Sequence, residues 1–135
     1  MALSRGVAHA SAQKRRAAYR HGHVAEVAAM LLLVAKGFHP LARRYKTPLG
    51  EIDLVMKRGR TIAFVEVKAR ALESEALESV GAQSERRIAD AADLWLARHP
   101  AASGHDLRFD MVVVRPWRLP RHVPDAFRPG FDKVA

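Results

Sequence analysis

GEIDLVMKRGRTIAFVEVKAR, residues 50–70, contains two apolar runs with a short polar segment between them. The runs, residues 51–56 and 61–68, are rich in Ile, Val, Leu and Phe, which favour β-strands. Residues 57–60, Lys-Arg-Gly-Arg, supply a turn. The segment is therefore predicted to form a β-hairpin.

Charged residues lie inside these apolar runs, where an uncompensated charge is costly. Asp53 belongs to the first run, and Glu66 and Lys68 belong to the second. If Lys57 opposes Arg60, side-chain alternation places these three and Glu51 on one side of the sheet, with Glu51 opposite Glu66 and Asp53 diagonal to it. Diagonal neighbours lie about 7–8 Å apart, so the two carboxylates could share one cation. The alternative is an exposed hairpin face with ordinary salt bridges.

This combination of side chains suits a metal-dependent phosphodiesterase site. Two carboxylates at one site repel each other unless a cation intervenes. Hard oxygen ligands suit Mg²⁺ or Mn²⁺. We predict Asp53 and Glu66 as metal ligands, and Lys68 as the group that positions water or stabilises developing phosphate charge.

The flanking segments predict two helices and two further strands. Apolar residues recur at steps of three or four over residues 24–34 and 88–96, and we expect the first of these helices to be largely buried. Residues 42–46 and 108–114 read as strands, so the order α-β-β-β-α-β predicts an α/β fold. Prolines after residue 115 exclude a long helix or a central strand from the C-terminal stretch. Aromatic residues of that stretch are expected to anchor it to the body, namely Trp117, Phe127 and Phe131.

Glu26 is the only charged residue between His23 and Lys36, within the first predicted helix. A buried carboxylate there would need a partner, such as a metal ion or a lysine. A solvated carboxylate near the helix start would instead be favourable to the helix dipole. Both interpretations are open from the residues alone.

The positive charge is concentrated at the two ends of the chain. The sequence has 23 Lys and Arg against 14 Asp and Glu, a net charge of +9. Residues 1–25 carry five bases and no acid, and residues 115–135 carry five bases and two acids. Basic ends on a nearly neutral body suit a nucleic acid, and a solvated surface without a partner is the alternative. The predicted nucleic-acid contacts are Lys14, Arg15, Arg16, Arg43, Arg44, Lys57, Arg58, Arg86 and Arg87.

Length and composition narrow the class of protein. A chain of 135 residues without cysteine excludes disulfide scaffolds and thiolate zinc sites. The longest apolar run, residues 27–35, is far shorter than the ~20 residues of a membrane span. We predict one domain over residues 21–128, with a basic arm at residues 1–20 and a tail at residues 129–135, in a cytoplasmic protein. The composition of the arm is also similar to that of a mitochondrial transit peptide, which is the lesser alternative.

The hairpin motifs are similar to those of a known family. GEIDLV at residues 50–55, followed by FVEVKAR at residues 64–70, resembles the signature of the YraN family of bacterial proteins. That family is related to archaeal Holliday junction resolvases within the restriction-endonuclease-like superfamily, whose PD-(D/E)XK pattern Asp53 and residues 66–68 match. The resemblance extends to Glu26 and to residues 108–110 and 122–127.

The resemblance implies a restriction-endonuclease-like αβββαβ core with a mixed central sheet. It implies Mg²⁺- or Mn²⁺-dependent cleavage of DNA, structured or branched, that leaves a 5′-phosphate. Glu26 would be an auxiliary catalytic group. A nucleic-acid-binding module for DNA or RNA that keeps the fold without turnover is the alternative, and a homodimer is open because junction cutters act on two symmetric strands.

Two positions depart from the family pattern. Ala25 stands where the family usually has glycine, and Ser84 stands where it often has a basic residue. Either Arg86 or Arg87 takes over a phosphate contact, or that contact is missing, and both alternatives are open.

Overall fold

The computed structural model describes residues 23–69 and 81–128. The predicted basic arm, residues 1–20, and the predicted tail, residues 129–135, lie outside these ranges. Residues 23–35 are helical and are called the N-terminal helix below. The elements that follow are β1 (His39–Lys46), β2 (Glu51–Arg58), β3 (Thr61–Ala69), α3 (Ala82–Arg98), the 3-10 helix η1 (Pro100–Ala102), β4 (Asp106–Val114) and β5 (Arg121–Val123).

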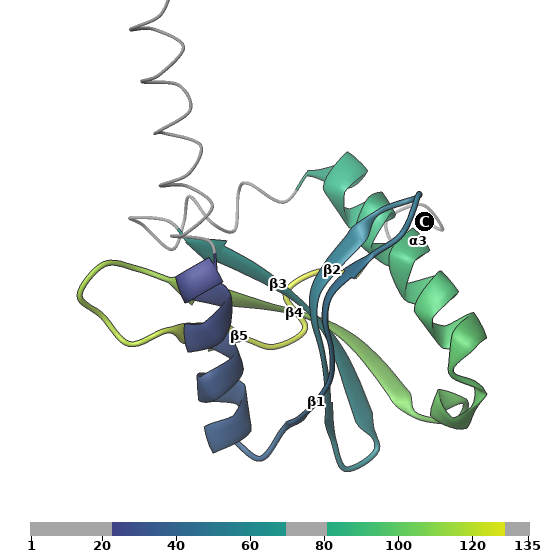
Figure 1. Ribbon diagram of the computed structural model, residues 1–135, viewed down its shortest axis with the longest axis horizontal. Coiled ribbons are helices and arrows are strands. Elements are labelled where there is room, and N and C mark those ends of the chain that lie inside the picture. Colours follow the sequence, from purple (N-terminus) through teal and green to yellow (C-terminus); the bar gives the residue numbers. More distant parts are fainter. Residues whose placement is uncertain (1–22, 70–80, 129–135) are drawn as a thin grey trace, which may run out of the picture.

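The strands form one mixed sheet in the order β1-β2-β3-β4-β5. Strands β3 and β4 are parallel, and the other neighbouring pairs are antiparallel. A parallel pair needs a crossover, and the segment that joins β3 to β4 contains α3. Figure 1 shows the N-terminal helix and α3 on opposite sides of the sheet. The predicted α/β class with a mixed sheet is confirmed.

Each helix covers its own apolar layer of the sheet. Beneath α3, Phe64 packs edge-on against Trp95, with the ring centroids 5.8 Å apart. Beneath the N-terminal helix, Leu33 packs with Leu54 and Met56. Strands β2 and β3 are covered on both faces, which explains why their sequences are nearly continuous apolar runs.

The pairing of β2 with β3 differs from the expected register. Lys57 pairs with Ile62 rather than with Arg60, so the turn is the dipeptide Gly59-Arg60. Gly59 has a φ of 61°, a left-handed conformation that glycine adopts without steric cost. The shift is two residues, and an even shift leaves the side chains of the paired residues 54–58 on their expected faces.

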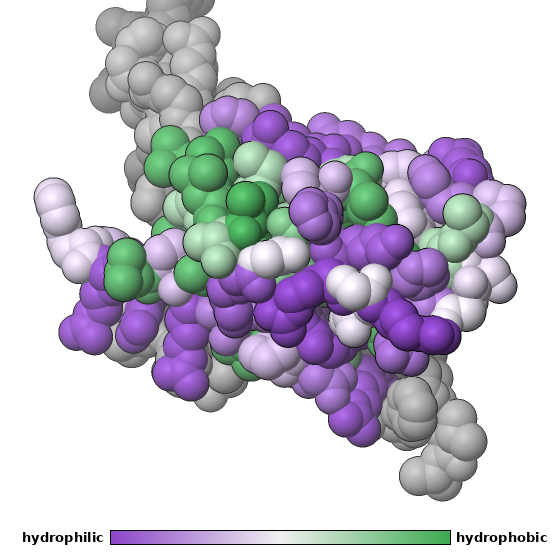
Figure 2. Space-filling view, turned by 90° about the horizontal axis from the view of Figure 1, so that it is seen from below, coloured by the Kyte–Doolittle hydropathy of each residue, from purple (hydrophilic) through white to green (hydrophobic). Residues whose placement is uncertain are grey.

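The N-terminal helix is less buried than its apolar composition predicts. Ala29 and Leu33 are fully buried against the sheet, but Val24 and Leu31 are 64% and 60% exposed. A hydrophobic patch is visible on one side of the molecule in Figure 2. The expectation of a largely buried helix was wrong because only one face of the helix meets the sheet.

The C-terminal stretch contributes one short edge strand, in keeping with its prolines. Phe127 is buried and contacts Phe109, with the ring centroids 5.5 Å apart, as expected of an anchor. Trp117 is fully exposed, so the expectation that it anchors this stretch was wrong. Phe131 lies outside the described residues. Within residues 23–69 and 81–128, neither helix combines the length and apolar character needed to cross a membrane.

Candidate active site

Asp53 lies at an irregularity where β1 and β2 both depart from simple alternation. Ile52 and Val55 are three residues apart, yet both face the core beneath α3. On β1, Arg43 pairs with Leu54 and Tyr45 pairs with Ile52. Arg44, which lies between them opposite Asp53, has a left-handed φ of 49°. The regular pairing of β2 with β3 extends no further than Leu54 in this direction.

The Asp53 side chain takes the place of a ladder acceptor. Its Oδ2 accepts a hydrogen bond of 2.8 Å from the backbone N–H of Val67 on β3. This bond satisfies a strand donor and holds the carboxylate against the neighbouring strand. The irregular backbone thus positions Asp53 beside the charged residues of β3.

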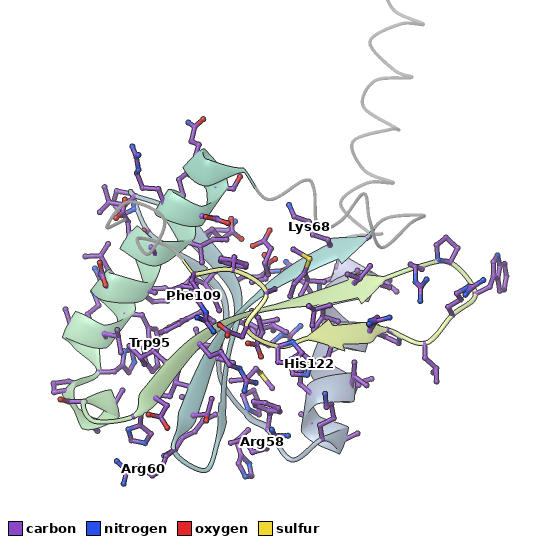
Figure 3. All side chains as sticks on the ribbon, turned by 180° about the vertical axis from the view of Figure 1, so that it is seen from behind. Arg58, Arg60, Lys68, Trp95, Phe109 and His122 are labelled. Carbon is purple, nitrogen blue, oxygen red and sulfur yellow. The ribbon has the colours of Figure 1, made fainter. Side chains whose placement is uncertain are left out.

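The structure brings the three predicted catalytic residues together. The carboxyl groups of Asp53 and Glu66 lie within hydrogen-bonding reach of each other. The Nζ of Lys68 lies 3.2 Å from Oε1 of Glu66, and both side chains are about four-fifths buried, with exposed fractions of 21% and 17%. Figure 3 shows Lys68 near the C-terminal end of β3.

The surroundings disfavour two ionised carboxylates at this place. Burial and the neighbouring Glu66 raise the pKa of Asp53 from 3.8 to about 7, against the lowering effect of the Val67 hydrogen bond. Burial also raises the pKa of Glu66, although Lys68 opposes this. A proton or a cation between the two groups removes the repulsion.

Glu26 borders the site from the N-terminal helix. It is buried, and its Oε2 lies 2.5 Å from Nε of Arg44, whose guanidinium also contacts the His23 ring. Its negative charge contributes to raising the pKa of Asp53. The partner of the buried Glu26 is therefore a partly exposed arginine, where the residues alone suggested a metal ion or a lysine.

A pocket opens between the hairpin and the start of α3. It has a volume of about 150 Å³ and is lined by Glu51, Glu66, Ser84, Arg87 and Ile88. The hairpin approaches α3 closely here, because a Cβ on Gly50 would lie 2.1 Å from the carbonyl oxygen of Arg87.

This pocket bears on the departure at Ser84. The two arginines expected to replace the missing base are both exposed, but Arg87 lines the pocket beside Glu66 and Arg86 is outside that lining. Glu51 was absent from the predicted catalytic set. It lies two residues before Asp53 on the same strand, and that spacing was the signal that could have included it.

Several predicted nucleic-acid contacts lie away from this pocket. Arg58, which is among them, lies at the other end of the sheet from Lys68 (Figure 3). Arg58 donates a hydrogen bond of 3.2 Å to the carbonyl of Lys36, and its guanidinium lies 4.4 Å from the centroid of the Phe38 ring. Lys57 directly precedes Arg58 on β2, and Arg43 is exposed on β1. The three predicted contacts in the basic arm lie outside the described residues, namely Lys14, Arg15 and Arg16.

Asp110 on β4 is a buried charge that belongs to the segment of family resemblance but was not among the predicted site residues. It is fully buried, and Arg108 donates to both its oxygens at 2.8 Å. The Nε2 of His122 lies 2.7 Å away, and the backbone N–H of Asp125 donates at 2.9 Å. Although burial opposes ionisation, these hydrogen bonds lower the pKa of Asp110 to about 2. A charged residue in an apolar strand was the available signal, the same one that identified Asp53.

The oxygen ligands of the site are few. Among residues 23–69 and 81–128, no group of three or more His, Cys, Asp or Glu side chains is arranged to hold a metal ion. A cation at Asp53 and Glu66 would keep water in its remaining positions, which is the usual habit of Mg²⁺.

Comparison with known proteins places the chain among relatives that match most of its length. The profile of the Uncharacterised protein family UPF0102 matches residues 25–114. A UPF0102 protein of Methylorubrum extorquens is 54% identical over 114 residues, which cover 84% of this chain and 89% of that protein. One of Mesorhizobium japonicum is 52% identical over 113 residues (84% and 90%), and one of Agrobacterium fabrum is 54% identical over 114 residues (84% and 93%). The resemblance to the YraN family is confirmed.

Proposed function

Given that this chain belongs to the Uncharacterised protein family UPF0102, we propose that it is a metal-dependent nuclease that hydrolyses phosphodiester bonds in DNA, structured or branched. The observation that carries the proposal is the meeting of Asp53, Glu66 and Lys68 beside the pocket at the start of α3. Buried ionisable groups gathered at a surface pocket are typical of a catalytic site.

The donor set fits a divalent cation. Asp53 and Glu66 present carboxylate oxygens within reach of each other, the ligand type that Mg²⁺ and Mn²⁺ prefer. These two residues would hold the ion. When bound, it would supply positive charge to the phosphate and acidify a coordinated water.

The remaining residues have roles that follow from their positions. Lys68, at 3.2 Å from Glu66, can hydrogen-bond a water or a phosphate oxygen next to the carboxylates. The ion pair of Glu26 with Arg44 borders Asp53 and would help to position it. Arg87 at the pocket would contact the phosphate. In the reaction, water adds to phosphorus and the bond from phosphorus to O3′ breaks, which leaves a 5′-phosphate and a 3′-hydroxyl.

The charge of the chain supports a nucleic-acid substrate. A net charge of +9 attracts a polyanion, and most of the excess lies in the two ends of the sequence.

A cleavage assay tests this proposal. End-labelled single-stranded, duplex, flap and four-way-junction DNA, and single-stranded RNA, are incubated with Mg²⁺, with Mn²⁺ or with a chelator. We expect cleavage of at least one DNA with either metal ion and none with the chelator. Asp53→Asn, Glu66→Gln and Lys68→Ala should abolish it.

Two matched variants control for non-specific effects. Asp106→Asn removes an exposed carboxylate from the opposite end of β4, and Lys36→Ala removes an exposed lysine that follows the N-terminal helix, close to Arg58 and away from the pocket. Both should cleave as the unaltered protein does. Tight binding of DNA with no metal-dependent cleavage of any substrate would refute the nuclease and leave the non-catalytic binding module.

A further inference from the structure

The loop between β4 and β5, residues 115–120, presents large apolar side chains to solvent. Trp117 is fully exposed and Leu119 is 87% exposed. Figure 1 shows this loop projecting from the body of the protein. Burial of these two side chains would be favourable, so their full exposure indicates a surface that meets a partner.

The backbone of the loop holds Trp117 in a strained conformation. The Arg118 N–H donates to the Arg115 carbonyl at 3.4 Å, which closes a turn with Pro116 and Trp117 at its centre. Proline suits the first central position of such a turn, but the φ of 60° at the second normally calls for glycine or asparagine. A tryptophan in this strained position is a common sign of a functional constraint.

The loop begins at the same end of the sheet as the candidate active site. Lys68 and Ala69 on β3 pair with Val113 and Val114 at the end of β4. Trp117 is three residues beyond Val114, so its backbone lies within about 10 Å of that end. Figure 3 shows the loop leaving β4 at the end of the sheet where Lys68 lies on β3.

The charge of the loop favours a polyanion over an apolar protein surface. Between Asp110 and Asp125 the chain has no acidic residue, and it carries three arginines, Arg115, Arg118 and Arg121. Arginines around an exposed aromatic ring are the usual composition of a surface that binds single-stranded nucleic acid, because phosphates meet the cations and bases stack on the ring.

We propose that Trp117 stacks on an unpaired base of the nucleic acid bound at Asp53 and Glu66, so that the β4–β5 loop selects substrates with single-stranded or branched character. This inference rests on the proposed function and deepens it. The ring would meet a base a few nucleotides from the scissile phosphate, because three residues of β3 and three of the loop separate Glu66 from Trp117, and Arg118 would contact the backbone beside that base. A fully paired duplex, whose bases are already stacked, offers no such base.

Tryptophan fluorescence reports on this stacking without any cleavage. The described residues include two tryptophans, of which Trp95 is buried and Trp117 is exposed. With a chelator present, we expect a short oligothymidylate to quench the emission of the full chain. Trp117→Phe should remove the quenched component and leave the Trp95 emission unchanged.

Affinity measurements then separate stacking from simple exposure. Stacking of one base on an aromatic side chain is worth enough to change affinity roughly tenfold. Trp117→Ala should weaken binding of single-stranded DNA about tenfold, Trp117→Phe should weaken it much less, and neither should alter binding of a blunt duplex. Leu107→Ala, at a half-exposed position near the start of β4, is the matched control and should bind as the unaltered chain does.

The outcomes distinguish this inference from the proposed function. Equal affinity of Trp117→Ala and the unaltered chain for single-stranded DNA would overturn the inference, while metal-dependent cleavage would still support the nuclease. A shift of the Trp117 emission on vesicles of phosphatidylcholine and phosphatidylglycerol, with none on oligothymidylate, would overturn it in favour of a membrane surface. Absence of any nucleic-acid binding by the unaltered chain would overturn both.

Discussion

The sheet contains two sites with a buried aspartate, and they differ in what surrounds the carboxylate. Asp110 receives four hydrogen bonds from Arg108, His122 and the backbone of Asp125. Asp53 accepts one from the Val67 backbone and has Glu66 within reach of its carboxyl group. The pKa is therefore about 2 for Asp110 and about 7 for Asp53.

The comparison shows that burial by itself does not identify a functional acid. The hydrogen-bond donors around Asp110 already compensate its negative charge, so no further cation is needed there. The same contacts attach β5 and the segment after it to β4. The environment of Asp53 favours a further positive charge, which is typical of a ligand site. One aspartate is thus expected to stabilise the fold and the other to support catalysis.

The largest expected difference is in cleavage. Asp53→Asn should lower the metal-dependent rate about a thousandfold or more, because losing a ligand forfeits several kcal/mol of transition-state stabilisation. Its free energy of unfolding should be unchanged or higher, because the substitution removes repulsion with Glu66. Single-turnover cleavage and urea unfolding of the same preparation measure the two quantities. Normal cleavage by Asp53→Asn would contradict the assignment of Asp53 to catalysis and of Asp110 to stability.

The reverse pattern is expected at Asp110. Asp110→Asn should lower the free energy of unfolding by about 3 kcal/mol, because it leaves Arg108 beside a neutral group inside the protein. Cleavage per folded molecule should change little. Urea unfolding at neutral pH, with Asp106→Asn as the control for an exposed carboxylate, gives the comparison. An unaltered midpoint would show that the hydrogen bonds of Asp110 do not stabilise the fold.

The pH dependence of stability sharpens this contrast. The pKa of Asp110 falls from 3.8 to about 2 on folding, so its ionised form stabilises the folded state above pH 4. This contribution, about 2 kcal/mol, is lost as the pH falls from about 4 to about 2. The difference in unfolding free energy between the unaltered chain and Asp110→Asn should narrow over that range. A constant difference would contradict the assignment.

The smallest effect is expected at the pocket beside Glu66. Arg87→Ala should weaken binding of duplex DNA several-fold and reduce the slope of log affinity against log salt by about 0.9, the value for one lost phosphate contact. Arg86→Ala, an exposed neighbour outside the pocket, is the matched control and should have a smaller effect. Titrations of a labelled duplex at several salt concentrations measure both. Equal salt slopes for Arg87→Ala and Arg86→Ala would mean that the position of Arg87 at the pocket does not make it a phosphate contact.

Local rules account for most of what could be predicted. The apolar runs predicted β2 and β3, and strict alternation along β3 placed Glu66 and Lys68 on one face. The cost of a charge inside an apolar strand identified Asp53 and could have identified Asp110 by the same reasoning. Helix periodicity located α3, but the apolar composition of the N-terminal helix overstated its burial. Composition does not show that only one face of this helix meets the sheet.

The sequence by itself determined strands β1 to β4, the α/β class and the identity of the charged residues, because propensity and alternation depend on neighbours along the chain, whereas the short edge strand β5 was not predicted. Only the tertiary structure decided the dipeptide turn at Gly59, the irregularity that holds Asp53 against β3, and the choice of Arg87 over Arg86 at the pocket. It also decided that Arg44 pairs with Glu26 and that Trp117 stands clear of the core. These features depend on register and on contacts between distant segments, which are set by the packing of the whole sheet and its helices and not by any local pattern.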